Sequence, residues 1–173
     1  MGKFREVKPD QITDNVIKLI GKDWMLITAG TLAKFNMMTA SWGGMGNLWN
    51  GPVAFAFVRP QRYTFPLMEE NAHFTLTFYD DGYRDVLNFC GTQSGRDVDK
   101  VAATGLTPVQ GITGAVYFAE ARLVLECRKV YAQDLKGENF VVPGMVDKFY
   151  AARDFHRLYV GEIVRCLVRE NEL

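Results

Sequence analysis

The sequence AEARLVLECR, residues 119–128, alternates between two kinds of side chain. One set is apolar and would share one face of an extended chain: Ala119, Ala121, Leu123, Leu125 and Cys127. The other set is charged and would share the opposite face, with Val124 as the exception: Glu120, Arg122, Glu126 and Arg128. Because successive side chains of a β-strand point to opposite faces, this pattern predicts a strand with one face on a core.

More strands are expected on both sides of this segment. Residues 74–78 repeat the alternation, and residues 53–58 form a continuous apolar run that is typical of a strand buried on both faces. The other predictions are a strand at 24–28, a turn at 29–31, a returning strand at 35–41, a hairpin turn at 136–139 into a strand at 140–142, and a last strand at 159–168.

Short helices are predicted between these strands, over residues 10–20, 64–71, 83–89 and 97–103. Many short strands with a few small helices indicate a mainly β fold, an antiparallel barrel with helical additions. Strands do not alternate regularly with long helices, and the glycine-rich Rossmann and P-loop motifs are absent. The length of 173 residues, without linker or repeat, predicts one domain over residues 1–173.

The composition narrows the class of protein. Twenty Lys and Arg balance twenty Asp and Glu, so the basic surplus typical of a nucleic-acid binder is missing. The N-terminus lacks the apolar stretch of a signal peptide, and no run reaches the length of a membrane span. Three widely spaced cysteines and two separated histidines predict neither a disulfide framework nor a zinc site. A cytoplasmic protein without a metal is therefore expected.

The first candidate binding segment is NMMTASWGG, residues 36–44. Small hydroxyl residues followed by two glycines would expose backbone N–H groups and let a ligand approach closely. Asn36, Thr39 and Ser41 could hydrogen-bond the edge of a flat heterocycle, while Met38 and Trp42 could pack against its apolar parts. Taken alone, the segment is better explained as a strand end with a glycine turn and a core tryptophan.

The second candidate is RPQRYT, residues 59–64, between a predicted buried strand and a predicted helix. Thr64 is a suitable N-cap, and a helix N-terminus favours an anion. Arg59 and Arg62 add fork-shaped, charge-assisted donors that suit phosphate. A polar loop with solvated arginines is an equally good interpretation of the spacing.

Two further segments could complete such a site. Arg96 and Lys100 stand four residues apart after Ser94 and would share one face of a short helix, although surface pairing with nearby aspartates is the more frequent outcome. Cys90 is expected to be buried and inert. His156, just before the last strand, could donate to a cofactor or titrate near neutral pH, although a lone histidine is more often structural.

Taken together and in order, these segments resemble the flavin-reductase-like family, and most closely its flavoredoxin branch. The resemblance covers nearly the whole chain and runs through these blocks: WMLITAG at 24–30, NMMTASWGG at 36–44, residues 52–58, RPQRYT at 59–64, SGRDVDK at 94–100 and HRLYVGEI at 156–163.

The resemblance implies a split β-barrel that binds FMN, forms a homodimer with the flavin near the subunit interface, and acts as an oxidoreductase. Residues implied around the isoalloxazine ring and ribityl chain are Asn36, Met38, Thr39, Ala40, Ser41 and Trp42. Residues implied at the phosphate are Arg59, Arg62, Tyr63 and Thr64, with Ser94, Arg96 and Lys100 as further members; His156 is placed near the pocket without a fixed role. Electrons would come from NAD(P)H or a protein donor and leave to an acceptor through the flavin.

Two other functions are compatible with the residues. A related split barrel could act as a non-catalytic binding protein for haem or a deazaflavin, although the arginines at 59–64 favour a ligand that carries phosphate. A β-barrel could also bind nucleic acid through its aromatic residues, and the zero net charge disfavours this.

Overall fold

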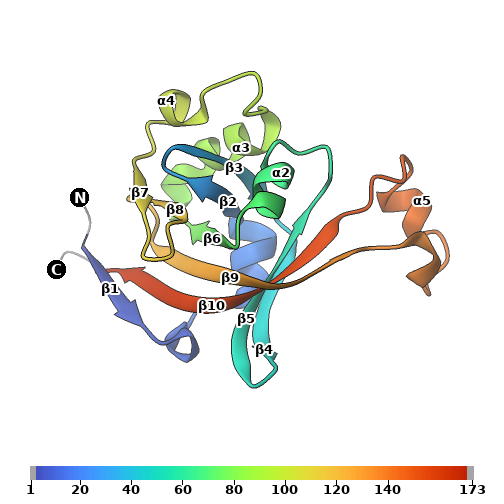
Figure 1. The fold of residues 1–173 in the computed structure, drawn as a ribbon, viewed down its shortest axis with the longest axis horizontal. Coiled ribbons are helices and arrows are strands. Elements are labelled where there is room, and N and C mark those ends of the chain that lie inside the picture. The colour runs from blue at the N-terminus through green and yellow to red at the C-terminus, as the bar shows by residue number, and fades with distance from the viewer. Residues whose placement is uncertain (1–2, 171–173) are drawn as a thin grey trace.

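The structure, a computed structural model, describes residues 3–170 and is built around one antiparallel sheet that curls into a barrel (Figure 1). The strands follow the order β3-β2-β6-β9-β10-β5-β4, and β1 also pairs with β10. Their bounds are β1 Phe4–Val7, β2 Met25–Thr31, β3 Lys34–Ala40, β4 Gly43–Leu48, β5 Gly51–Val58, β6 His73–Phe78, β9 Leu123–Asp134 and β10 Arg157–Arg169. A separate two-stranded ribbon joins β7 Pro108–Gln110 to β8 Val116–Phe118.

The long last strand, β10, is where the barrel splits. Its first half, Arg157–Glu162, pairs with β5, whereas its last residues, Cys166–Arg169, pair with β1. β9 accompanies β10 along almost its whole length, with irregularities after Val160 and Ile163. At the first irregularity, a Cβ on Gly161 would lie 2.6 Å from the Phe74 ring and 2.8 Å from Cys127 Cβ. Only glycine therefore fits at this position of β10, where the strand passes close to Phe74 and Cys127.

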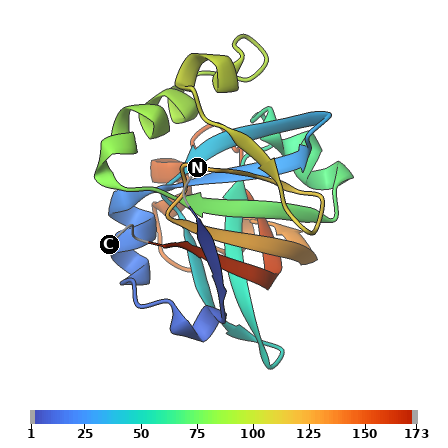
Figure 2. The ribbon, with the colours of Figure 1, turned by 90° about the vertical axis from the view of Figure 1, so that its left-hand side faces the viewer.

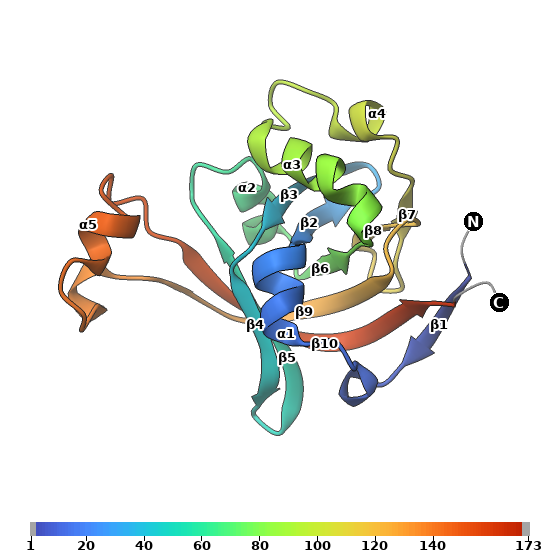
Figure 3. The same ribbon diagram turned by 180° about the vertical axis from the view of Figure 1, so that it is seen from behind.

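The helices are short; α1, α2 and α3 pack on the barrel, α4 packs on α3, and α5 lies on a segment that projects from the barrel (Figures 2 and 3). Helices α2 and α3 contact β2 and β3, whereas α1 contacts β4. The α-helical bounds are α1 Val16–Lys18, α2 Thr64–Glu70, α3 Arg84–Thr92, α4 Lys100–Thr104 and α5 Met145–Phe149. The 3₁₀ turns are η1 Pro9–Gln11, η3 Asp81–Tyr83 and η4 Gly137–Asn139, and η2 Leu19–Asp23 is a π-turn that continues α1.

Two apolar clusters hold these elements together. The larger lies inside the barrel and includes Met25, Phe74 and Leu76, while the smaller includes Leu26 and Leu87 under α3. Burial of such side chains contributes about 1.5–3 kcal/mol each, so the two clusters fix the positions of β2, β3 and α3. These three elements carry much of the site described below.

The predicted mainly β barrel is confirmed, but several local predictions are wrong. Strand β2 continues to Thr31, so the turn falls after residues 29–31 rather than on them. Residues 119–122 lie outside the strand, because the Ala121 amide closes a turn by bonding to the Phe118 carbonyl, and β9 starts only at Leu123. Glu126, expected to face solvent, is fully buried and ion-paired with Arg165. The charged face of the opening segment therefore lies partly inside the molecule.

Three more boundaries differ from prediction. The helix predicted at 10–20 is broken because the Asn15 side chain accepts the Lys18 amide and caps a new helix. Residues 140–142 form no strand, since Phe140 packs on Tyr150 and Phe155 in a wide loop. The expected glycine turn at 43–44 is the start of strand β4, which the sequence analysis missed together with β1, β7 and β8.

Candidate cofactor-binding site

One cavity of about 700 Å³ gathers every residue that was predicted to bind a cofactor. It lies between the end of β3, the loop from β5 to α2, the end of α3 with the loop that follows, and the start of β10. All fourteen predicted residues line it: Asn36, Met38, Thr39, Ala40, Ser41, Trp42, Arg59, Arg62, Tyr63, Thr64, Ser94, Arg96, Lys100 and His156.

One wall of the cavity is a buried polar contact between β3 and α2. The Asn36 Nδ2 atom donates to Thr64 Oγ1 at 2.8 Å, and both side chains are buried. Gly95 closes over this pair, because a Cβ there would overlap Asn36 Oδ1 and lie 2.9 Å from Tyr63 Cδ1. A backbone without a side chain is therefore needed at Gly95 to keep the wall in place.

Thr64 does not act as the predicted N-cap. Helix α2 begins at Thr64 itself, Tyr63 occupies the cap position, and no side chain caps the helix. The threonine hydroxyl accepts the Asn36 hydrogen bond instead, so Thr64 lines the cavity but does not have the predicted local role.

The other end of β3 presents a half-exposed surface to the cavity. Thr39 Oγ1 donates to the Leu87 carbonyl of α3 at 2.5 Å, which ties the strand end to that helix. Met38 is buried, whereas Trp42 keeps 43% of its surface exposed and lies edge-on to Phe149. This end of the cavity therefore combines apolar faces with a few hydrogen-bonding groups, as planar ligands require.

The cavity is strongly basic for a chain with no net charge. Arg59, Arg62, Arg96 and Lys100 line it, and among the described lining residues there is no Asp or Glu. Among residues 3–170, the Arg62 guanidinium bonds only to the Gly91 carbonyl, at 3.3 Å, and Arg96 Nη1 bonds to the Gln61 carbonyl at 3.0 Å. Because carbonyls do not neutralise a guanidinium, the positive charge remains available to an anion.

Lys100 is the most deeply placed of these cations. Its Nζ donates to the carbonyls of Met37, at 2.9 Å, and Cys90, at 2.7 Å, and only 5% of the residue is exposed. Burial and the nearby Arg62 lower the pKa of this ammonium. A buried cation held only by carbonyls gains most from a negatively charged ligand.

Arg59 differs from the other cavity cations because it already has an acidic partner. Its guanidinium is ion-paired with Asp154, donates to the Phe149 carbonyl at 3.0 Å and lies over the Tyr150 ring. Gln61 Nε2 also donates to Asp154, at 2.6 Å. Arg59 therefore lines the cavity, but its ion pair and its hydrogen bond are made with residues 149–154.

His156 forms part of the wall next to Trp42. The two ring centroids are 5.1 Å apart, and His156 Nδ1 lies 2.8 Å from the Tyr150 hydroxyl. Burial, followed by the charge of Arg59, lowers the pKa of His156 to about 4. The expectation that it titrates near neutral pH is therefore wrong, and the imidazole is neutral at pH 7.

Six lining residues were not predicted to bind: Phe57, Gln61, Cys90, Thr92, Gln93 and Gly95. Most of them lie inside or beside the segments that the sequence analysis selected, so reading whole segments would have found them. Cys90 is buried as expected, and burial raises the pKa of its thiol. Nothing in the sequence marked Phe57 as a lining residue, because it stands in an apolar run whose two faces cannot be distinguished by residue type.

No helix within residues 3–170 is both long enough and apolar enough to cross a membrane.

An antiparallel split barrel with a basic, partly aromatic cavity at the end of its third strand defines a class of ligand-binding barrels. Within it, the chain belongs to the flavin reductase like domain family, whose pattern matches residues 18–173. A curated relative from Aeropyrum pernix, an uncharacterized protein, is 29% identical over 133 residues, which are 76% of this chain. The chain spans about half, 50%, of the length of that relative.

Solved structures with the same fold carry flavin-related names. Flavoredoxin from Methanosarcina acetivorans is 27% identical, with a TM-score of 0.68 over 96% of this chain and 78% of that one. An FMN-binding protein from Thermus thermophilus, solved with bound p-hydroxybenzaldehyde, is 21% identical, with a TM-score of 0.69 over 96% and 83%. A Streptomyces globisporus NADH:FAD oxidoreductase is 18% identical, with a TM-score of 0.62 over 86% and 75%. The last two likenesses concern the fold alone.

Proposed function

We propose that this chain binds FMN in the cavity and serves as an FMN-dependent oxidoreductase of the flavoredoxin or flavin reductase type. The observation that carries the proposal is the charge of the cavity, which has four cationic lining residues and no acidic one among the described residues. Membership of the flavin reductase like family and the likeness to a flavoredoxin support FMN as the anion.

In this proposal Arg62, Arg96 and Lys100 hold the phosphate, because none of them is ion-paired with a described carboxylate. Arg59 contributes less to the phosphate, since Asp154 already neutralises it. The strand end from Asn36 to Trp42 takes the ring, where Met38 and Trp42 supply apolar contact. Aromatic and apolar contact on one side with charge-assisted bonds on the other suits a ligand with a flat ring and a phosphate tail.

FMN, once bound, would supply the redox chemistry, and the protein would bind and orient it and limit its contact with water. NAD(P)H or a protein donor would deliver electrons, and a small molecule or protein would accept them. The neutral His156 and the buried polar pair at Asn36 and Thr64 would offer hydrogen bonds without adding charge to the ring. We place the protein in the cytoplasm, consistent with free, buried cysteines in the described chain.

We also propose a homodimer with the cofactor near the subunit interface. Apolar side chains stay exposed beside the cavity and on the loop that follows β9: Ile17 at 85%, Trp42 at 43% and Val141 at 94%. Ile17 and Trp42 line one groove with other apolar residues, and a contiguous exposed apolar surface of this kind is typical of an interface. Light scattering after gel filtration tests this: a dimeric mass is expected, and a monomer at micromolar concentration would contradict it.

An absorption spectrum of the purified protein tests the cofactor. The flavin bands are expected, either as purified or after FMN is added and excess removed, and NADH or NADPH added without oxygen should bleach them if the pyridine nucleotide is the donor. Dithionite bleaches a bound flavin whatever its natural donor is, so it serves as the control. A colourless protein that retains no added FMN would contradict the proposal, and a Soret band would indicate haem instead.

A further inference from the structure

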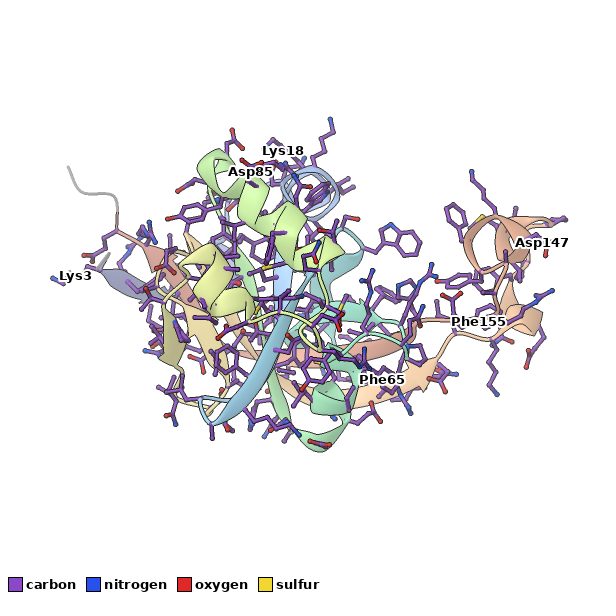
Figure 4. All side chains as sticks on the ribbon, turned by 90° about the horizontal axis from the view of Figure 1, so that it is seen from above. Lys3, Lys18, Phe65, Asp85, Asp147 and Phe155 are labelled. Atoms are coloured by element: carbon purple, nitrogen blue, oxygen red, sulfur yellow. The ribbon has the colours of Figure 1, made fainter. Side chains whose placement is uncertain are left out.

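A long excursion between the last two strands reaches out from the barrel and returns at the cavity. We call residues 135–156 the arm; it carries α5 and projects from the barrel, while its returning half contacts Arg59 and Trp42 (Figure 1). In the view from above, the labelled Asp147 and Phe155 lie on this projecting part (Figure 4). The arm ends at His156, so its position decides where that imidazole stands.

Arg59, at the end of β5, holds the returning half of the arm. The guanidinium is ion-paired with Asp154, donates to the Phe149 carbonyl at 3.0 Å and has its central carbon 5.3 Å from the centroid of the Tyr150 ring. One side chain thereby contacts residues from both ends of the segment that leads back to β10. Charge-assisted bonds at two points with a stacked ring fix orientation as well as distance.

The Tyr150 hydroxyl fixes the protonation pattern of His156. The oxygen lies 2.8 Å from Nδ1 and has no other hydrogen-bond partner among the described side chains. If Nδ1 carried the proton, the buried tyrosine O–H would be left without an acceptor. If Tyr150 donates to Nδ1, both groups are satisfied and the imidazole proton sits on Nε2.

Burial, helped by the neighbouring arginines, keeps the imidazole neutral. Burial is the largest cause that lowers the pKa of His156; Arg59 and Arg62 lower it further and Asp154 raises it, with a net fall to about 4. Tyr150 keeps its proton, because burial raises its pKa. Asp154 is also bound to Arg59 and Gln61, which limits its effect on the ring.

We propose that Tyr150 and Arg59 are positioning residues that hold His156 as a neutral imidazole protonated on Nε2, so that it offers one hydrogen-bond donor to a planar heterocycle in the cavity. The ligand class follows from the geometry: a carbonyl oxygen or an unprotonated ring nitrogen of a flat ring stacked near Trp42, whose own ring lies 5.1 Å from His156. The inference rests on the proposed function only for the identity of that ring, the isoalloxazine of FMN.

Nitrogen-15 NMR of the ligand-free protein tests the protonation state directly. The chain contains two histidines, so in a His73→Gln variant the only histidine signals are those of His156. We expect a single neutral tautomer at pH 6, with its one ring proton on Nε2. In Tyr150→Phe the Nδ1 resonance should move to the position of a free ring nitrogen, and in Arg59→Gln the pKa of His156 should rise from about 4 toward 6.5. A proton on Nδ1, or no change in either variant, would overturn the proposal.

FMN titration of the same variants tests whether the donor meets a ligand. Tyr150→Phe should weaken FMN binding by about 3- to 10-fold, the usual effect of one hydrogen bond. Tyr79→Phe is the matched control, because it also removes a buried tyrosine hydroxyl, the one 2.9 Å from Thr77 Oγ1, outside the cavity. An altered His156 signal with unchanged FMN affinity would overturn the ligand-facing role. Failure of the wild-type protein to bind FMN would refute the proposed function and leave the NMR result standing.

Discussion

Gly95 gives the sharpest prediction, because the cavity wall has no room for a side chain there. In Gly95→Ala, the new Cβ would overlap Asn36 Oδ1 and lie 2.9 Å from Tyr63 Cδ1. Asn36 must then move and loosen its 2.8 Å bond to Thr64, both of which are buried. Overpacking costs about 1–3 kcal/mol and a disrupted buried hydrogen bond about 1–3 kcal/mol, so we expect a loss of about 3 kcal/mol in unfolding free energy.

Urea unfolding of the ligand-free protein measures this loss, and FMN titration measures its effect on the site. Gly46→Ala is the matched control, because a Cβ at Gly46 meets nothing within 4 Å. Gly95→Ala should also weaken FMN binding by at least tenfold, since Asn36, Tyr63 and Thr64 all line the cavity. An unfolding free energy within about 0.5 kcal/mol of wild type would refute this description of the wall.

Three further predictions concern charge. Because the pKa of His156 is about 4 when folded and 6.5 when unfolded, the unfolded state binds more protons below pH 6.5. Stability should therefore fall between pH 6.5 and 4, by about 2 kcal/mol after allowance for screening, and His156→Gln should flatten this part of the urea-derived curve. Glu126→Ala should cost about 2–3 kcal/mol by urea unfolding, because it removes a fully buried carboxylate that pairs with Arg165 and accepts from Thr113, while Arg165 keeps its exposed partner Glu6; an effect below about 1 kcal/mol would contradict this role of Glu126. Arg62→Ala with Arg96→Ala should weaken FMN binding by at least tenfold in a titration, whereas Arg128→Ala, which removes an exposed cation paired with Glu162, should not.

Much of the fold could be predicted because its signals are local. The alternation at 74–78 and the apolar run at 53–58 correspond to β6 and β5. In such strands the order of apolar and polar residues in the sequence directly indicates which side chains are buried. The burial of Glu126 could not be predicted, because its partner Arg165 is 39 residues away. Strand β4 was missed for a related reason: its glycine-rich sequence has no pattern of its own and is held by pairing with β5.

The site shows the same division between local and distant information. Fourteen of the residues that line the cavity were predicted from short segments and from the family resemblance, and the structure brings these fourteen together. The role of Arg59 was out of reach, because Asp154 lies 95 positions away and only the folded arm brings it near. Likewise, a lone histidine in the sequence gives no sign of the burial and the arginine charge that lower the pKa of His156.

The central claim is that the basic cavity binds FMN through its phosphate. Calorimetric titration of the ligand-free protein with FMN and with riboflavin, which has the same ring and no phosphate, tests it most directly. We expect FMN to bind at least 100-fold more tightly, about 2.7 kcal/mol, as two or more charge-assisted contacts would provide. Equal affinity for the two compounds, or no binding of FMN, would contradict the account.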